Sequence, residues 1–446
     1  MRLRLAVIAG LFVTLFASVA FLLWSQFIAN RNHVLEIPGP GPAGFPDAPP
    51  KLSARRSGEA ATTSPANETP PPPVPAAATK LSDADPQEPL ENPPEMIKAI
   101  YATSWSAGSK AKMDYLIDLL KTTELNAIVI DVKDFSGLVA YATDLSLPKE
   151  YRAVELRIPK VNVLLKRLHS EGIYAIARIS VFQDERLALA RPDLGLMSST
   201  TGMLWRDHKN LPWIDVAARE AWDYNIAIAR EALERGFDEV NFDYVRFAAD
   251  GDLSDIRYPF WDMKTSRRKV LKDFWEYVRN ALPGKRLSVD LFGLTTVNTD
   301  DLGIGQKLEN AFPYFDDIAP MLYPSHYYSG TFNFKSPADH PYEVVTYSME
   351  AAIRRLKTYN KQQITDNLQL NGATSTTPIT NNQLPITKFR PWLQDFDLGA
   401  NYDATMVRKE IQAVYDAASS TPELLGGWML WNPSNVYTRE ALLTDN

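Results

Sequence analysis

From residue 96 onward, short apolar runs alternate with stretches that have the periodicity of amphipathic helices. This order is typical of βα units, in which parallel strands are covered by helices. Eight strands are expected, at residues 97–103, 127–132, 174–181, 239–245, 287–292, 318–323, 388–393 and 428–431. The helices expected between them lie at 113–122, 161–170, 218–235, 263–281, 342–358 and 405–418. The fifth crossover, near 305–311, is short.

Eight strands with intervening helices over residues 96–440 predict a (β/α)8 TIM barrel with insertions. A doubly wound open sheet is the alternative, and it normally has a Gly-rich phosphate loop after its first strand. Here that position reads Ala-Thr-Ser-Trp, at residues 102–105, which favours the barrel. Residues 371–387 are rich in Thr, Asn and Pro and are expected to form an inserted surface loop, before or after the seventh strand.

Residues 5–28 form an uncharged and almost wholly apolar run. At about 1.5 Å per residue, such a helix is long enough to cross a bilayer of about 30 Å. Arg2 and Arg4 precede the run and Arg31 follows it, which places the N-terminus in the cytoplasm and the body of the chain outside. A cleaved signal peptide and a secreted protein are the alternative, because residues 17–20 resemble a cleavage site.

The sequence therefore predicts a membrane anchor at residues 1–30 and a disordered linker at 31–95. Of the 32 prolines, 16 lie between Pro38 and Pro94, where Phe45 is the only aromatic residue. A segment of this composition cannot bury enough apolar surface to offset its chain entropy.

The charge and the metal-ligand residues exclude several functions. The net charge is -7 and there is no basic stripe, so nucleic acid is not an expected partner. Cysteine is absent and the five histidines are scattered, which argues against a disulfide, a thiolate site or a histidine metal cluster. No metal and no cofactor are expected.

The strand at 239–245 has polar side chains at every second position. Glu239, Asn241 and Asp243 therefore share one face of the strand. An acidic row on a buried parallel strand needs partners or a chemical role. Because TIM barrels place their active sites at the C-terminal ends of the strands, Asp243 is the central catalytic candidate. Asp316 and Asp317 precede the sixth strand and are expected at the opposite end.

Asp131 and Asp290 lie on the second and fifth strands and complete the set of catalytic candidates with Asp243. Two carboxyl groups that face each other in a mouth lined with aromatic rings suit the hydrolysis of glycosidic bonds. The side chains expected to bind substrate are Lys133, Arg178, Tyr244, Arg246, Tyr323, His326, Arg390, Trp392, Gln394, Trp431 and Asn432.

Each of these residues also has a structural interpretation. Asp243 can pair with Arg178 or Arg246 inside the barrel. Asp131 and Lys133 share a strand face and can neutralise each other. His326 can contact substrate or order a loop, and Trp392 and Trp431 can belong to the core.

Several sequence blocks resemble a bacterial family first catalogued as a domain of unknown function, described as putative glycoside hydrolases and grouped with amylase-like TIM barrels. The resemblance covers about residues 97–438. The blocks are AIVIDVKD (127–134), GFDEVNFDYVRF (236–247), DIAPMLYPSH (317–326), RPWLQDF (390–396) and GWMLWNPSNVY (427–437).

The resemblance implies a (β/α)8 barrel that acts on, or at least binds, a polysaccharide outside the cytoplasm. In amylase-like retaining hydrolases the nucleophile is an aspartate at the tip of strand four, which corresponds to Asp243. Their general acid is usually a glutamate at the tip of strand five, where this chain has Asp290. Strand four is also similar to the chitinase pattern, but Val245 replaces its final glutamate, which disfavours that mechanism.

Two functions are expected from these observations. The first is a membrane-tethered glycoside hydrolase, with Asp243 as nucleophile or charge stabiliser, Asp290 as acid, and Asp131 and Arg178 orienting the substrate. The second is a non-catalytic glycan-binding or scaffold module of the cell envelope. The second predicts that Asp243 is locked in an ion pair with no second acid nearby.

Overall fold

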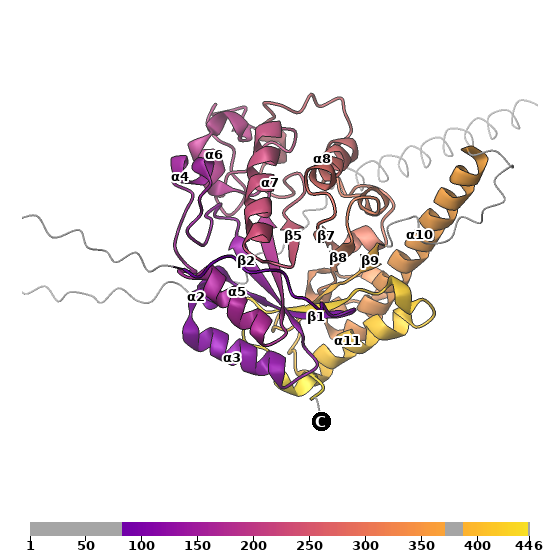
Figure 1. Cartoon of the computed structure of the whole chain (residues 1–446). Helices are drawn as coiled ribbons and strands as arrows, with labels where there is room; N and C mark the ends of the chain where they lie inside the picture. The colour runs from indigo at the N-terminus through magenta and orange to yellow at the C-terminus, as the bar shows by residue number, and fades with distance from the viewer. Residues whose placement is uncertain (1–82, 371–386, 445–446) are drawn as a thin grey trace, which may run out of the picture.

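The computed structural model describes residues 83–370 and 387–444 (Figure 1). The predicted membrane anchor and most of the predicted linker lie outside these residues. Within the described ranges, no helix combines the length and the apolarity needed to cross a membrane.

Parallel strands close into a barrel with eight strand positions, as predicted. The order is β10-β11-β1-β2-β3-β5-β7-β8-β9, and a further pairing of β10 with β8 closes the ring. The strands are β1 (Ile97–Ala102), β2 (Ala127–Lys133), β3 (Tyr174–Ser180), β5 (Glu239–Asp243), β7 (Leu287–Phe292), β8 (Asp317–Met321), β9 (Lys388–Phe389), β10 (Trp392–Gln394) and β11 (Gly427–Trp431).

The seventh strand position follows the 371–387 segment and is divided into β9 and β10. Pro391 lies between the two pieces, and proline has no N–H to donate to a sheet. The main chain remains in the barrel on both sides of it, because Arg390 N donates to Ile318 O (2.9 Å) and Met429 N donates to Pro391 O (2.9 Å).

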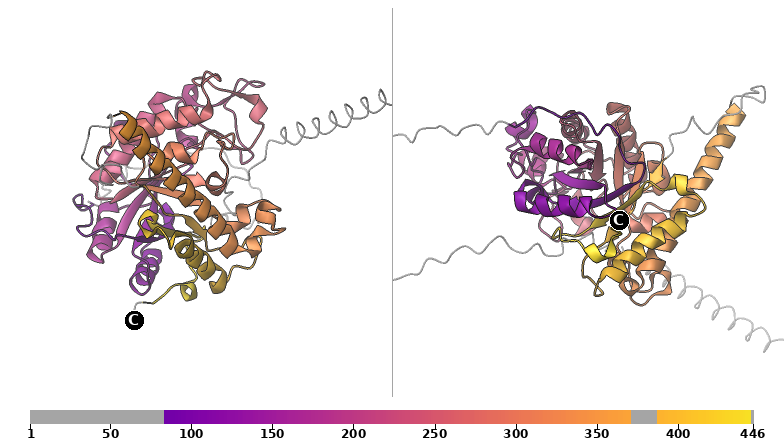
Figure 2. Two further views of the ribbon diagram at one scale, coloured as in Figure 1. Left: turned by 90° about the vertical axis from the view of Figure 1, so that its right-hand side faces the viewer. Right: turned by 60° about the horizontal axis from the view of Figure 1, so that its bottom comes forward.

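Helices surround the barrel (Figures 1 and 2). They are α2 (Ser104–Gly108), α3 (Lys110–Lys121), α4 (Ser146–Glu150), α5 (Val161–Ser170), α6 (Glu185–Ala190), α7 (Arg219–Glu234), α8 (Arg267–Ala281), α9 (Leu308–Ala311), α10 (Pro341–Leu370) and α11 (Ala404–Ala418). The far end of α10 extends beyond the body of the protein (Figure 2). The short strands β4 (Met197–Ser198) and β6 (Ile256–Arg257) pair in antiparallel fashion, and the sequence did not predict them.

Two apolar cores follow from the alternation of side chains along the strands. The larger core packs the outer face of the barrel against the helices, and Val240 and Phe242 of β5 belong to it. The smaller core fills the barrel lumen and includes Val129, Trp392 and Met429. Polar side chains that point into the lumen are therefore removed from water and need partners.

The floor of the barrel, at the N-terminal ends of the strands, contains such a paired set. Glu239 forms an ion pair with Arg390, and both side chains are fully buried. Arg286 donates to Asp317 at 2.7 Å, and Arg279 donates to Asp316 at 2.8 Å. Asp316 and Asp317 thus lie at the end opposite to the candidate site, where the sequence placed them.

Residues 83–94, which the sequence assigned to the linker, run from the N-terminus of α5 to this floor. Asp83 accepts hydrogen bonds from the N–H groups of Asn162 (3.0 Å) and Val163 (3.1 Å), at the N-terminus of α5. Leu90 N donates to Asp238 Oδ1 at 2.6 Å. A cavity of about 300 Å³ remains between the segment and the floor.

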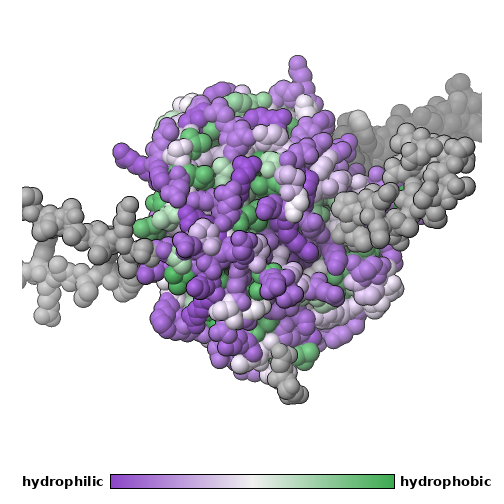
Figure 3. Space-filling model, viewed as in Figure 1, coloured by the Kyte–Doolittle hydropathy of each residue, from purple (hydrophilic) through white to green (hydrophobic). Residues whose placement is uncertain are grey.

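On the face shown in Figure 3, the surface is largely hydrophilic, with scattered apolar areas.

Candidate active site

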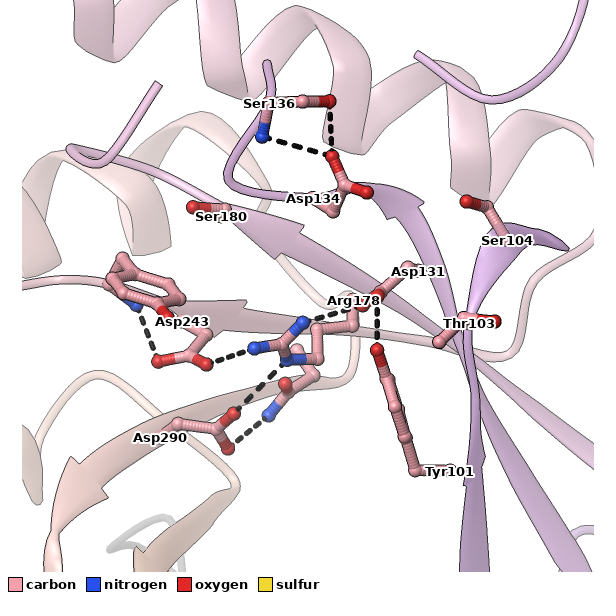
Figure 4. Close-up of polar contacts among 12 residues, drawn as sticks. Tyr101, Thr103, Ser104, Asp131, Asp134, Ser136, Arg178, Ser180, Asp243 and Asp290 are labelled. Atoms are coloured by element: carbon pink, nitrogen blue, oxygen red, sulfur yellow. Dashed lines mark hydrogen bonds and ion pairs between the residues drawn. The ribbon is translucent and has the colours of Figure 1, made fainter. Parts of the chain in front are cut away.

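Three carboxyl groups converge on one arginine at the C-terminal ends of the strands (Figure 4). Arg178 lies on β3, between β2 and β5. Its Nη1 donates to Asp131 Oδ1 at 2.5 Å, and its Nη2 donates to Asp243 Oδ2. Its Nε lies 3.7 Å from Asp290 Oδ2. The guanidinium therefore bridges all three predicted catalytic residues.

Burial removes Arg178 from water, which alone would lower its pKa, but the charges of Asp131 and Asp243 raise the pKa well above the usual arginine value. The guanidinium therefore remains charged. Its side chain is 16% exposed, compared with 8% for Asp243, 4% for Asp131 and 2% for Asp290. Asp290 is consequently the most deeply placed of the three acids.

Asp290 is the carboxyl group whose protonated form is favoured near pH 7. Burial raises the pKa of Asp290 to about 8, and the neighbouring charge of Asp243 contributes to the shift. Oδ1 of Asp290 accepts hydrogen bonds from Asn241 Nδ2 (2.9 Å) and Trp392 Nε1 (2.8 Å). Because both of these donors use Oδ1, the proton is expected on Oδ2, the oxygen that faces Arg178.

Asp131 has both oxygens occupied. Arg178 binds one, and the hydroxyl group of the buried Tyr101 donates to the other. Burial raises the pKa of Asp131, against the opposing charge of Arg178. Saturated contacts of this kind suit a group that orients Arg178 rather than one that exchanges protons with a substrate.

The backbone is strained immediately after Asp243. Tyr244 has a φ of 52°, in the left-handed region that non-glycine residues rarely adopt, at a cost on the order of 1–3 kcal/mol. Tyr244 N donates to Asp243 Oδ1 at 2.5 Å. The turn thus ends β5 and fixes the orientation of the Asp243 carboxylate at the strand tip.

An aromatic cluster lies at the tips of the last three strand positions. Trp431 packs against Tyr323 and Phe396, with ring centroids 5.3 and 5.0 Å apart. His326 joins this cluster 5.3 Å from Tyr323, and its Nδ1 lies 3.0 Å from Ser325 Oγ. Burial lowers the pKa of His326 to about 4, so its ring is neutral near pH 7. The flat rings are suited to the apolar faces of sugars.

Arg246 does not pair with Asp243, which answers one of the questions left open by the sequence. The salt-bridge partner of Asp243 is Arg178. The Arg246 guanidinium packs over the rings of Trp213 (4.6 Å), Phe292 (4.9 Å) and Tyr244 (5.5 Å). Burial lowers its pKa.

Two predicted substrate-binding residues are corrected by the structure. Lys133 does not neutralise Asp131. It pairs with Asp184 at 2.6 Å, with both side chains fully buried, because the register of β2 shifts between Asp131 and Lys133. Arg390 lies on the barrel floor with Glu239, away from the strand tips. Neither side chain is placed to meet a substrate.

Gln394, Asn432 and Trp392 organise the site from within. Gln394 Oε1 accepts a hydrogen bond from Ser325 Oγ (2.8 Å), and its Nε2 donates to Phe396 O (3.0 Å). Asn432 donates to the main chain of Asp395. Trp392 fills the lumen and holds Asp290. We therefore interpret these three residues as supports for the strand-tip loops and the acid.

Sequence reasoning did not select Tyr101 or Asn241 as site residues. Tyr101 occupies a lumen position on β1 and contacts Asp131, whereas Asn241 contacts Asp290. The alternation of side chains along their strands was the sequence signal that could have placed them in the lumen.

Among the residues that the structure describes, no group of three or more His, Asp or Glu side chains is arranged to hold a metal ion.

The barrel and its strand-tip carboxyl groups can be compared with known proteins. A family described as "Putative glycosyl hydrolase domain" matches residues 99–437. The chain belongs to this family. A comparison with curated proteins returned no match.

Among solved structures, a hypothetical protein from Ruminiclostridium thermocellum ATCC 27405 is 34% identical. The match covers 46% of this chain and 98% of that protein, with a TM-score of 0.40. The glycoside hydrolase domain of PgaB (BpsB) from Bordetella bronchiseptica is 12% identical, with a TM-score of 0.53. That match covers 79% of this chain and all of that domain (100%), and it shows a shared fold.

Proposed function

We propose that this protein is a glycoside hydrolase that cleaves O-glycosyl bonds of a polysaccharide outside the cytoplasm. The observation that carries the proposal is the pairing of two unlike carboxyl groups at the strand tips. Asp243 contacts a cation, whereas the pKa of Asp290 is raised to about 8 by burial and by Asp243. Unlike protonation of two neighbouring acids is what general acid catalysis near neutral pH requires.

In the proposed reaction, Asp243 faces the anomeric carbon as nucleophile or charge stabiliser. Asp290 Oδ2 gives its proton to the leaving oxygen as the bond between that oxygen and the anomeric carbon breaks. Water then supplies the hydroxyl group of the product, and its proton returns to Asp290. An aspartate nucleophile at the tip of the fourth strand is also the amylase-like arrangement.

Arg178 has a specific part in this mechanism. Two carboxyl groups close together normally share a single charge. The Arg178 guanidinium contacts Asp131 and Asp243 directly but lies 3.7 Å from Asp290. We infer that this asymmetry separates the roles of the two catalytic acids.

The non-catalytic glycan-binding module remains the second candidate, because the ion pair between Asp243 and Arg178 is what it predicts. It also predicts that no second acid is nearby. Asp290 contacts the same guanidinium and favours its proton, so the hydrolase explains more of the geometry.

We also propose that residues 1–30 anchor the protein in the cell membrane with the barrel on the extracytoplasmic side. The proposal rests on the apolar run at 5–28 and on the arginines that flank it. Protease added to intact cells should then degrade the barrel while a cytoplasmic control protein survives. Protection of the barrel until the cells are lysed would contradict this orientation.

Aryl glycosides with different leaving groups test the two catalytic roles. Asp290→Asn should retain kcat/KM toward a dinitrophenyl glycoside, whose leaving group needs no proton, and lose kcat/KM toward the phenyl glycoside. Asp243→Asn should lose both activities. Equal losses on both substrates in Asp290→Asn would remove Asp290 from the role of acid.

A further inference from the structure

One tryptophan on the catalytic side of the barrel is exposed. Trp105 lies shortly after β1, on the short helix α2, and is 61% exposed. All other tryptophans in the described ranges are buried or half-buried. An exposed indole on a loop at a strand tip suggests a binding role, because such rings are costly to leave in water.

The ring of Trp105 is held in place from one side. The Arg157 guanidinium lies 5.1 Å from its centroid. Arg157 is itself fixed by Asp134 (2.5 Å), Glu155 (2.5 Å) and Ser104 Oγ (3.3 Å). The indole therefore rests on a rigid cation, which lowers the entropy that it loses when a ligand binds.

The backbone beneath Trp105 is equally constrained. Thr103 Oγ1 caps α2 by accepting a hydrogen bond from Ser106 N at 3.1 Å. A Cβ at Gly108 would lie 1.7 Å from Arg157 O, so α2 packs directly on the main chain of Arg157. The loop that carries Trp105 is thus a fixed part of the barrel rim.

The surroundings of Trp105 combine apolar and hydrogen-bonding groups. Leu156 is 59% exposed and adjoins Arg157, and Val436 is 55% exposed. Val436 follows Asn435, whose side chain accepts a hydrogen bond from Thr103 N at 3.0 Å. Figure 4 shows Ser104 and Asp134 on the same side of the barrel as Asp131. One flat ring bordered by polar side chains matches a sugar, which has apolar ring faces and hydroxyl groups at its edges.

We propose that Trp105 is a stacking platform for a pyranose ring of the substrate polysaccharide, at a subsite away from the bond that is cleaved. The inference rests on the proposed function and extends it, because it requires a substrate several sugars long. A protein partner fits less well, since a stable protein interface usually buries more than about 1,000 Å². Trp105 and two aliphatic side chains offer a much smaller apolar area.

The platform is tested in the full-length protein with Asp243→Asn in the background, so that bound sugar is not consumed. Hexaoses of α-1,4-glucose, β-1,4-glucose and β-1,4-N-acetylglucosamine are the probes, with the matching disaccharides. Trp105→Ala should weaken the binding of one hexaose about tenfold and the disaccharide less. Trp105→Phe, which keeps a ring, should recover part of the affinity.

Leu443→Ala is the matched control. Leu443 is 56% exposed, but it lies beside Glu124, in the loop that precedes β2 at the opposite end of the barrel. This variant should bind the hexaose as tightly as the background protein. A second readout is acrylamide quenching of tryptophan fluorescence, which the hexaose should reduce more in the background protein than in Trp105→Phe.

The outcomes separate this proposal from the proposed function. If Trp105→Ala binds every hexaose as tightly as the background protein, or if no hexaose binds to that protein, the platform is overturned. If Trp105→Ala weakens hexaose binding while Asp243→Asn still releases reducing ends at the wild-type rate, the platform stands and the catalytic assignment falls.

Discussion

Asp243 and Asp290 contact the same guanidinium from neighbouring strands of the barrel. Arg178 donates to Asp243 through Nη2 and lies 3.7 Å from Asp290 through Nε. Burial and the charge of Asp243 together raise the pKa of Asp290 to about 8. Asp290 with its raised pKa and Asp243 with its cationic partner, next to a ring-lined surface, form the chemical core of the proposed hydrolase.

The pH dependence of activity should report the protonation of Asp290. Because the acid form is required, kcat/KM should fall as the pH rises through about 8. The limb should be visible with a phenyl glycoside and absent with a dinitrophenyl glycoside, whose leaving group needs no proton. The residual activity of Asp290→Asn toward the phenyl glycoside should also lack it. A basic limb that persists unchanged in Asp290→Asn would assign the titration to another group.

Arg178→Gln should destabilise the barrel. The substitution leaves Asp131 and Asp243 without their cation in a buried site, and breaking such a cluster costs about 3–5 kcal/mol. Urea unfolding measures the change. Arg191→Gln is the control, because Arg191 pairs with Asp193 and Glu220, whose side chains are more than half exposed, and should cost less than about 1 kcal/mol. Equal stability of the two variants would show that the cluster contributes little.

Glu239→Gln should separate stability from catalysis. Glu239 shares a strand face with Asp243, but it lies at the floor, where it pairs with the fully buried Arg390. Loss of its charge should cost about 3–5 kcal/mol of unfolding free energy. Turnover per folded molecule should be unchanged at a temperature where the variant remains folded. A large fall in kcat without a fall in stability would contradict the assignment of Glu239 to the floor.

The packing of residues 83–94 against the barrel should depend on Gly236. Gly236 has a φ of 106°, and a Cβ at this position would lie 2.4 Å from Gln87 O. Gly236→Ala should therefore destabilise the barrel and make the segment more sensitive to limited proteolysis. Gly172→Ala is the matched control, because Gly172 has a φ of 72° with nothing within 4 Å. Gly172→Ala therefore tests the cost of backbone strain alone. Equal protease sensitivity in the two variants would count against the contact between residue 236 and Gln87.

The sequence predicted the fold well because the strands and helices of the barrel have clear local periodicities of apolar and polar residues. The strand at 239–245 shows this most clearly. Its period-two pattern placed Glu239, Asn241 and Asp243 on one face of the strand. In the structure Val240 and Phe242, on the other face, belong to the outer core.

The candidate site was less predictable, because it depends on register and height along the barrel axis. A register shift after Asp131 turns Lys133 toward Asp184. Arg390 lies beside β8, well below the strand tips. The sequence did not predict this height because it did not predict the break in the strand at Pro391. The alternation along β1 could place Tyr101 on a strand face, but not predict its hydrogen bond to Asp131, which joins two different strands.

The central claim is that Asp243 takes part in cleaving a glycan. Reducing-end release by the full-length protein should be measured across α- and β-linked polysaccharides, with Asp243→Asn alongside. We expect release from at least one polysaccharide and a loss of about a thousandfold or more in the variant, assayed at a temperature where the variant remains folded. Release that is equal in the variant, or no release from any polysaccharide while one of them binds saturably, would contradict the account and favour the glycan-binding module.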